Sequence, residues 1–508
     1  MALFLVGLCL AAVIILYFSN NPLGHSRKFM IRRFINWFPL GMSYAFLYMG
    51  RYNLNVSKNA LGDMMTKEQF GIIFAAGTIT YGLSFLINGP IVDKIGGKKG
   101  IIIATLGSSL MNLLMGGATY LYLMGRLKTN MVVAFSILFA MNMFFQSYGA
   151  VSIIKVKAYW FHVRERGVFG AIFGTLISFG VYFAFDWGQA IVEASKLHIE
   201  GQMTAFQKFI QHIFAIDTGM TNATWLVFTI PAFLLICWAL IDMILLKDSP
   251  KEANFGDFDT ADASSDDDEN LKITMKVVLK KVFSSPIMYT IALVDFTSGV
   301  LRNGIMQWYL VFAHEMKGVD ENFYNASQFF IKNWGLLLCL TGIIGGFMAG
   351  MLSDRVFQSR RGPPAAINNA LMIVLLIVMS IFLTKEPNIV GGAAVLITLA
   401  VIGVHSLMSG TAAADFGGKK MTATASGIVD GCVYLGSGIQ SLAIGYLSVK
   451  SWHYWPLFLL PFAFMGLFLS LRMWNELPEA TKKYILKKEQ EAAKEQGTTI
   501  GAGDPATN

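Results

Sequence analysis

Long apolar runs recur along the whole chain and constrain its fold more than any other feature of the sequence. A spanning α-helix needs about 20 apolar residues, and such windows occur about twelve times in the main body and once more at the N-terminus. Of the 508 residues, 55% are hydrophobic and only 14% are charged. Because backbone polar groups must be satisfied inside a bilayer, the chain is predicted to be an all-α membrane protein.

The apolar runs divide into one extra N-terminal helix and two sets of six helices. The segment 1–33 lacks a charged start and a cleavage pattern and ends in basic residues, so we expect an uncleaved helix rather than a signal peptide. The first bundle, 34–247, is expected to contain helices at 34–57, 70–92, 100–124, 131–158, 167–191 and 225–246. The second bundle, 286–475, is expected to contain helices at 286–312, 329–352, 365–383, 389–410, 422–448 and 455–473.

Three polar segments interrupt this pattern. The linker 248–285 is acidic and rich in serine and aspartate, so we expect a flexible cytoplasmic connector. The tail 476–508 is expected to be cytoplasmic and to begin as a polar helix. Between the fifth and sixth helices, the stretch "FQKFIQHIFAI" predicts a short interfacial helix.

Basic residues set the predicted orientation. With the N-terminus of the core inside, the clusters "DKIGGKKG", "FHVRERG", "SDRVFQSRRG" and "FGGKK" all fall on the cytoplasmic side. Loops that face anionic lipid explain the net charge of +8, so nucleic acid is not an expected partner. We expect a monomeric, multi-pass protein of the cell membrane, which in a bacterium is the inner membrane.

One arginine lies inside the first helix of each bundle. Arg51 in "YMGRYNLNV" and Arg302 in "GVLRNGIMQW" each lie about sixteen residues into their helix, which is about 24 Å of rise. Such a repeat predicts a binding site near the membrane midplane, between the bundles. Because arginine keeps its proton and its fork matches phosphate oxygens, the pair predicts a dianionic phosphoryl substrate and favours exchange over one-way transport.

Two tyrosines and an aspartate lie on the same helix faces as these arginines. Tyr44 and Tyr48 precede Arg51 by seven and three residues, and they either contact the substrate or simply pack. Asp295 lies seven residues before Arg302. We favour a pairing of Asp295 with Arg302, and the alternative is a role as a proton-binding or substrate-binding group.

Two further titratable residues are weaker candidates for the same site. Lys155 lies near the inner end of the fourth helix and is a possible cavity residue. His405 either titrates or is a hydrogen-bonded histidine inside the bundle.

A repeated turn follows the second helix of each bundle. It reads "GPIVDK" in the first and "GMLSDR" in the second. We expect Gly89 and Gly350 to permit close helix approach. Asp93 and Asp354 are expected to lock one conformation by binding a neighbouring helix N-terminus, and Arg355 is expected to take part in the same gating.

Sequence signatures of enzymes are missing. The chain has no P-loop spacing, no zinc-ligand spacing and no Gly-x-Ser-x-Gly elbow, and its four cysteines fall inside apolar runs. We therefore predict neither an enzymatic activity nor a cofactor or metal.

The paired turns resemble those of the major facilitator superfamily. More narrowly, "YAFLYMGRYNLNVS" and "LRNGIMQW" are similar to the organophosphate:phosphate antiporters, such as the bacterial glycerol-3-phosphate and hexose-phosphate transporters, and the similarity runs through 34–475. The resemblance implies two pseudo-symmetric six-helix bundles that exchange an organic phosphate for inorganic phosphate by alternating access. It also implies phosphate binding by Arg51 and Arg302, and cavity positions for Tyr44, Tyr48, Tyr81, Gln146 and Tyr434.

Three positions depart from the pattern of this family. Phe85 replaces a typical lysine, Ile177 a frequent histidine and Asp295 a usual asparagine. The identity of the organic group therefore stays open. Two other functions also stay open: a transporter-like receptor that senses a phosphorylated metabolite, and a proton-coupled transporter of another organic anion.

Overall fold

The protein is represented by a computed structural model. The structure describes residues 2–61, 65–162, 165–195, 205–213, 223–256, 284–412 and 422–476. Within these ranges the regular structure is helical and contains no strand. The linker expected at 248–285 falls largely outside the described residues, as does nearly all of the tail expected at 476–508.

The first half of the molecule follows an additional helix, α1 (Ala2–Ser19). It contains α2 (Arg27–Leu61), α3 (Lys67–Ile95), α4 (Gly97–Leu123), α5 (Met131–Trp160), α6 (Arg166–Tyr182), η3 (Phe183–Trp187), α7 (Gly188–Ser195), α8 (Ala205–Ile213) and α9 (Leu226–Leu245), with the short turn η4 (Lys251–Ala253) behind it.

The second half contains the remaining helices. They are α11 (Pro286–Met306), α12 (Trp308–Glu315), η6 (Met316–Gly318), α13 (Glu321–Ala326), α14 (Gln328–Lys332), α15 (Trp334–Met351), η7 (Leu352–Val356), α16 (Gly362–Phe382), α17 (Pro387–His405), η8 (Ser406–Ala412), α19 (Thr422–Lys450) and α20 (Tyr454–Arg472). Every expected run coincides with helix where it is described, and the ends shift by seven residues at most.

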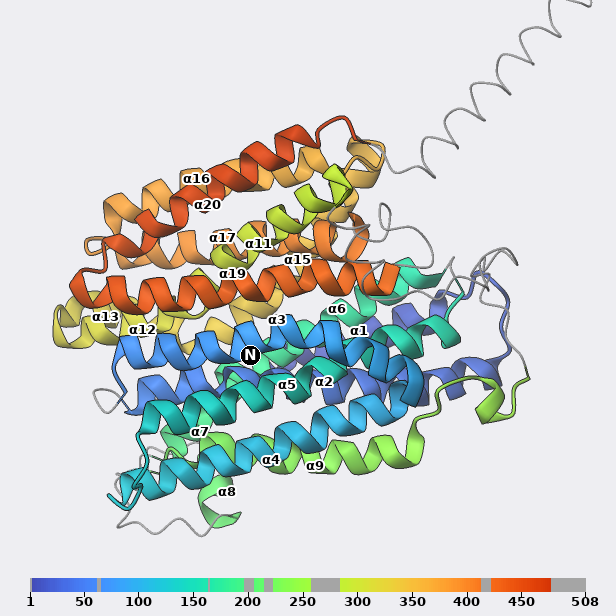
Figure 1. Ribbon diagram of the computed structural model, residues 1–508, viewed down its shortest axis with the longest axis horizontal. Helices are drawn as coiled ribbons and strands as arrows, with labels where there is room; N and C mark the ends of the chain where they lie inside the picture. Colours follow the sequence, from blue (N-terminus) through green and yellow to red (C-terminus); the bar gives the residue numbers. More distant parts are fainter. Residues whose placement is uncertain are drawn as a thin grey trace, which may run out of the picture.

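The long helices run side by side along the long axis of the molecule (Figure 1). The second half, drawn from yellow to red, lies above the first half, drawn from blue to green. The two halves meet where α3 packs against α19 and where α6 packs against α15. This junction is the region where a site shared by both halves must lie.

The composition of the helices fits a bilayer. Ten helices in the described part of the chain are long and apolar enough to cross a membrane. The two arginine-bearing helices, α2 and α11, are not among those ten, because polar residues lower their mean hydropathy. Large apolar side chains face outward on many helices, such as Leu110, Val374 and Phe468, as expected for contact with lipid tails.

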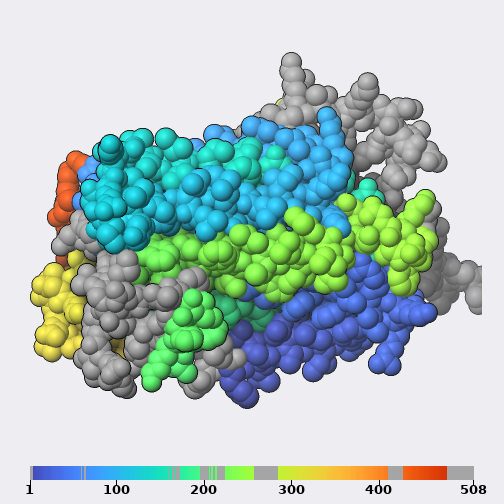
Figure 2. Space-filling model, turned by 90° about the horizontal axis from the view of Figure 1, so that it is seen from below, coloured from blue at the N-terminus to red at the C-terminus, as the bar shows by residue number. Residues whose placement is uncertain are grey.

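One face of the first half shows how its helices cover one another. In Figure 2 the N-terminal residues, α9 and α4 form neighbouring blue, yellow-green and cyan bands. The contacts of α9 with both α2 and α4 agree with this arrangement. The short helix α8 projects below α9, and its Phe209 and Ile213 are more than half exposed, which confirms the helix that we expected in this loop.

The helix α2 begins at Arg27, seven residues before the expected start at 34. Ser26 explains the early start, because its hydroxyl accepts a hydrogen bond from the backbone N–H of Phe29 at 3.3 Å. Asn21 closes the preceding turn through two hydrogen bonds with the backbone of His25. The basic segment is therefore the first part of α2 and not a loop.

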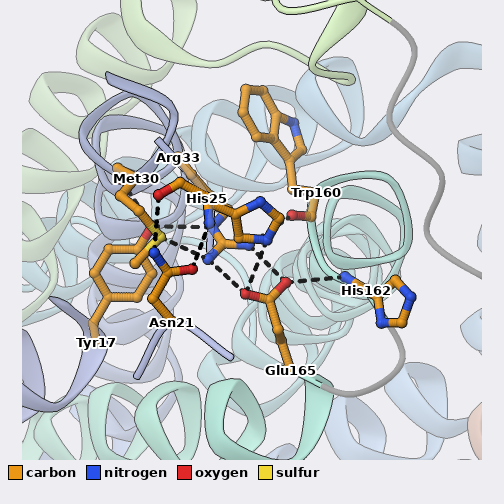
Figure 3. A network of polar contacts seen from close by, with 8 residues as sticks. All are labelled: Tyr17, Asn21, His25, Met30, Arg33, Trp160, His162 and Glu165. Carbon is orange, nitrogen blue, oxygen red and sulfur yellow. Dashed lines mark hydrogen bonds and ion pairs between the residues drawn. The ribbon is translucent and has the colours of Figure 1, made fainter. Parts of the chain in front are cut away.

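A buried ion pair fastens the extra helix to the first half (Figure 3). The Arg33 guanidinium donates to both carboxylate oxygens of Glu165 at 2.9 Å, and its Nε donates to the Tyr17 hydroxyl of α1 at 3.0 Å. Tyr17 in turn donates to the Met30 carbonyl at 2.8 Å. The paired bonds of arginine with carboxylate are among the strongest that side chains form, so this network fixes α1, α2 and the segment before α6.

The same network lowers the pKa of the Glu165 carboxyl. Burial alone would raise that pKa, but the hydrogen bonds and charge of Arg33, with a smaller contribution from His25, bring it below its ordinary value of 4.5. The His25 Nε2 lies 3.3 Å from Glu165 Oε1. Glu165 therefore remains ionised at neutral pH and keeps its hold on Arg33.

The variant Glu165→Gln is expected to lose about 3–5 kcal/mol of stability at neutral pH, because the Arg33 charge stays buried without its counter-charge. The wild-type advantage is complete above the ordinary pKa of 4.5 and disappears as the pH falls through the lower folded-state value. Thermal unfolding in detergent, followed across this pH range, measures both effects. The exposed Glu193→Gln is the matched control, and an equal loss in both variants would contradict the assignment.

Candidate functional site

The arginines of α2 and α11 both lie close to one tyrosine ring. Tyr434 comes from α19, and the guanidinium carbon of Arg51 lies 5.5 Å from the centre of its ring. The guanidinium carbon of Arg302 lies 5.7 Å from the same ring. The structure thus brings together the two arginines that the sequence repeat singled out.

Arg51 is held by neutral groups. Its Nε donates to Gln146 Oε1 at 3.0 Å and its Nη1 donates to the Tyr434 hydroxyl at 2.8 Å. Its guanidinium also lies 4.6 Å from the Tyr48 ring and 4.4 Å from the Tyr81 ring. Aromatic faces attract a cation without neutralising its charge, so Arg51 remains a net positive group.

Neither arginine has a carboxylate partner among the described residues. Nη2 of Arg51 and Nε of Arg302 are buried and lack a hydrogen-bond acceptor there. Arg33, which has a structural role, instead binds Glu165 with two hydrogen bonds. Buried donors without acceptors are costly, and an anion within reach of both guanidinium groups would satisfy both of them.

The aromatic residues expected at the site are present around Arg51. The rings of Tyr44 and Tyr48 lie 5.5 Å apart, and those of Tyr81 and Tyr434 lie 4.3 Å apart. Phe85 lies next to them, 4.9 Å from the Tyr81 ring. The departure from the family pattern at this position therefore places a neutral ring at the edge of the site.

A ladder of buried amides supports Arg51, and sequence reasoning identified Gln146 in it but missed the other members. Asn142 donates to the Gly50 carbonyl at 2.9 Å, and Gln146 donates to Ser108 at 3.1 Å. Asn53 donates to Asn112 at 2.6 Å. Isolated amides inside apolar runs were the available signal, because such groups must find partners within a membrane.

Hydrogen bonds also cross between the halves beside Arg302. The Tyr52 hydroxyl donates to Asn303 Oδ1 at 3.3 Å, and Asn55 donates to the Gln307 carbonyl at 3.3 Å. Asn303 donates to Ser437 of α19 at 2.5 Å. These bonds connect the arginine-bearing helices α2 and α11.

The preferred partner of Asp295 was wrong. Asp295 accepts a hydrogen bond from Ser298 at 2.9 Å and lies 3.1 Å from His405 Nδ1, and the described residues show no ion pair of Asp295 with Arg302. A spacing of seven residues places Asp295 and Arg302 on the same face of α11, but it also separates their side chains by nearly two helical turns. His405 is hydrogen-bonded inside the second half, which is the second of the two roles considered for it.

Lys155 does not join the arginines. Its Nζ binds Asp93 at 2.9 Å, and the Asp93 side chain is 62% exposed. The lysine therefore lies at the surface-exposed end of the first half. Asp93 was expected to bind a helix N-terminus. The residue that does so is Asp248, which accepts a hydrogen bond from the backbone N–H of Lys98 at the start of α4, at 2.7 Å.

The second repeated turn forms local contacts. Asp354 binds Arg361 and accepts a hydrogen bond from Ser359, both within the same turn, while Arg355 is exposed. Their expected role in gating stays a prediction.

The carboxyl group of Asp248, which binds the N-terminus of α4, is partly buried. Burial raises the pKa of this carboxyl group, and the hydrogen bond from the backbone N–H of Lys98 lowers it.

The glycines of the repeated turns do not form the close contacts expected of them. A Cβ added at Gly89 or Gly350 would meet nothing within 4 Å. The close approach occurs at the junction of the halves, where a Cβ on Gly82 would lie 2.7 Å from the Gly431 carbonyl oxygen. Gly71 meets the backbone of Ser441 in the same way.

Polar contacts reinforce the junction of the two halves near Lys67, the first residue of α3. The Lys67 ammonium donates to Glu315 and to the Ser448 carbonyl, each at 2.9 Å. Asp186 of η3 accepts from the backbone N–H groups of Gly335 and Leu336 at 2.8 and 3.2 Å. Because those N–H groups begin α15, Asp186 caps a helix of the opposite half.

The sequence profile of the Major Facilitator Superfamily matches residues 40–441. Membrane sensor protein UhpC of Salmonella typhimurium is 25% identical, and the match covers 86% of this chain and 91% of that protein. A probable hexose phosphate transport protein of Chlamydia trachomatis is 22% identical, covering 88% and 92%. The glycerol-3-phosphate transporter of Bacillus subtilis is 22% identical, covering 79% and 83%.

Solved structures share the fold. A bacterial homolog of the human lysosomal transporter Spinster, in an inward-facing and unoccupied conformation, has a TM-score of 0.61 at 12% identity. The match covers 88% of this chain and 99% of that chain.

The variant Gly82→Val is expected to separate α3 from α19, because the added side chain overlaps the Gly431 backbone. Spin labels at the exposed positions Glu68 and Val449 measure the separation by electron paramagnetic resonance. We expect a longer, broader distance distribution than in the wild type. Gly89→Val, on the same helix but facing open space, should leave the distribution unchanged. An unaltered distance in Gly82→Val would contradict the tight junction.

Proposed function

The chain belongs to the major facilitator superfamily, and from that premise we propose that it is a secondary transporter that exchanges an organic phosphate for inorganic phosphate by alternating access. The substrate class is that of sugar phosphates and glycerol phosphate. Relatives named as hexose phosphate and glycerol-3-phosphate transporters support this class.

One observation carries the proposal. Arg51 and Arg302 come from opposite halves, lie 5.5 and 5.7 Å from the Tyr434 ring, and keep buried N–H donors that find no acceptor among the described residues. A phosphoryl group has oxygen acceptors for both guanidinium groups, and its negative charge compensates their positive charges. Inorganic phosphate presents the same oxygens, so one site serves both substrates of an exchanger.

The contacts between the halves suggest how binding is linked to movement. The Lys67 end of the junction is closed by Lys67, Asp186 and the glycine contacts at Gly71 and Gly82. Alternating access requires these contacts to break while the opposite end closes. An anion that pulls Arg51 and Arg302 together lowers the cost of that rearrangement, whereas the empty site resists it because two unpaired cations approach one another.

The proposal extends to the setting of the protein. We place it as a monomer in the cell membrane with the core N-terminus in the cytoplasm, because that orientation puts the basic clusters inside. The Lys67 end of the molecule then faces the exterior. Residues of the repeated turns, Asp93, Asp354 and Arg355, lie at the cytoplasmic end.

A second candidate is a receptor that binds the same phosphorylated ligand without moving it at a useful rate. The similarity to Membrane sensor protein UhpC favours this reading. The ligand site would be the same, because Arg51 and Arg302 bind the anion in either case. The difference lies in flux, not in recognition.

Substitution of the paired arginines tests the site. Arg51→Gln and Arg302→Gln should each weaken binding of glycerol 3-phosphate by roughly tenfold to a hundredfold, because each removes charge-assisted hydrogen bonds worth about 1.5–3 kcal/mol. Isothermal titration of purified protein measures the loss. The exposed Arg126→Gln should bind as the wild type does. Wild-type affinity in both site variants would overturn the assignment.

Flux separates the two candidates. Proteoliposomes that contain the wild-type protein and internal phosphate should take up labelled phosphate rapidly, and unlabelled glycerol 3-phosphate outside should compete. Binding without measurable exchange would favour the receptor. Uptake of an organic anion that phosphate fails to displace would point to a different anion transporter.

A further inference from the structure

Three ionisable side chains of the second half form a row that the phosphate site does not use. Asp295 lies on α11, His405 is the last residue of α17, and Asp430 lies on α19. His405 lies between the two carboxylates, with Nδ1 3.1 Å from Asp295 Oδ1 and Nε2 3.9 Å from Asp430 Oδ1. The row therefore joins α17 and α19 to α11, against which both helices pack.

Asp295, the inner end of the row, is fully buried. Its Oδ1 accepts from Ser298 and faces His405, but its Oδ2 has no hydrogen-bond partner among the described residues. An ionised carboxylate with one unsatisfied oxygen is costly in a membrane interior. A proton on Asp295, or a positive charge on His405, relieves that cost.

Asp430, the outer end of the row, is more accessible. Its side chain is 31% exposed and that of His405 is 22% exposed, against 0% for Asp295. The Ser409 hydroxyl donates to Asp430 Oδ1 at 2.5 Å. Ser409 belongs to η8, a π-helical turn of a kind that is frequent at functional sites. The row thus leads from an accessible carboxylate through an imidazole to a buried carboxylate.

Few other titratable groups face this row. On the same helices, Cys432 interacts with Asp295, and Arg302 interacts electrostatically with Asp430. Tyr434 lies one turn after Asp430 on α19, while Tyr289, Tyr446 and Lys450 lie further along the two helices. The neighbouring helix α15 carries only Cys339, and α16 carries no titratable residue. On α20 the only titratable residues are Tyr454 and Arg472, at its two ends. Among the described residues, Arg302 is therefore the charged group outside the row that acts on it.

We propose that Asp295, His405 and Asp430 form a binding site for one exchangeable proton, and that occupation of the phosphate site at Arg302 increases the affinity of this site for the proton. The inference rests on the proposed function, because the coupling acts through an anion bound at Arg302.

Electrostatics gives the coupling its sign. The positive charge of Arg302 disfavours protonation of the row. A dianion bound at Arg302 cancels that charge, so the row takes up a proton as the anion binds. By thermodynamic linkage, a proton on the row must strengthen anion binding by the same factor. Transport of the anion is then accompanied by a proton, and acid on one side favours loading from that side.

Proton uptake on ligand binding tests the inference. Glycerol 3-phosphate is added to purified wild-type protein in a weakly buffered solution at about pH 8, where the ester is already dianionic because its second pKa is about 6. A pH indicator should then report uptake of about one proton per bound ligand. Over the pH range in which the row titrates, the dissociation constant should rise up to tenfold per pH unit.

Three variants address the row one residue at a time. Asp295→Asn, His405→Gln and Asp430→Asn should each reduce the proton uptake toward zero and flatten the pH dependence of binding. Asp430 is the most exposed member, so its variant keeps the test valid if Asp295→Asn fails to fold. The exposed Glu386→Gln, at the opposite end of α17, and the exposed His453→Gln serve as controls and should take up the proton normally.

The outcomes separate the two proposals. Ligand binding without proton uptake overturns the inference and leaves the proposed function standing, and so does an uptake that all three variants retain. Failure of the wild-type protein to bind any phosphorylated compound overturns both. Dependence of binding on sodium instead of pH also contradicts a proton site.

Discussion

A guanidinium inside a membrane needs an anion, and this requirement organises the molecule around Arg51 and Arg302. The protein has two ways to meet it. Arg33, at the base of the extra helix, has a carboxylate fixed beside it, and the result is a rigid anchor. Arg51 has an amide, a phenol and aromatic faces. These groups hold the side chain in place but leave its charge uncompensated, which keeps a position open for an exchangeable partner.

Close backbone approach at glycines and polar side chains together join the halves. Gly71, Gly82 and Gly431 allow α3 and α19 to touch, while Asp186 binds the first N–H groups of α15 across the junction. The glycine contacts place no side chain between the two helices at these points. They therefore form and break with little repacking, which suits two halves that must move against each other in each cycle.

Much of this architecture follows from local sequence, and the failures have a common cause. Apolar runs predicted the helices because a bilayer leaves the backbone no alternative, and the repeat predicted that Arg51 and Arg302 would meet. Partners across the junction could not be predicted. Glycine spacing favoured Gly89, but only the placement of α19 shows that Gly82 forms the contact. Helix periodicity likewise suggested Arg302 for Asp295, whereas α17 supplies His405.

The tight contact at Gly82 also bears on how such a protein can diversify. Gly431 lies one helical turn before Tyr434, and a Cβ at Gly82 would reach the Tyr434 side chain as well as the Gly431 carbonyl. The contact between the two halves at Gly82 and the Tyr434 ring near both arginines are thus parts of one small surface. Selection acting on turnover speed would unavoidably alter ligand preference, so new specificities should arise together with altered cycling rates.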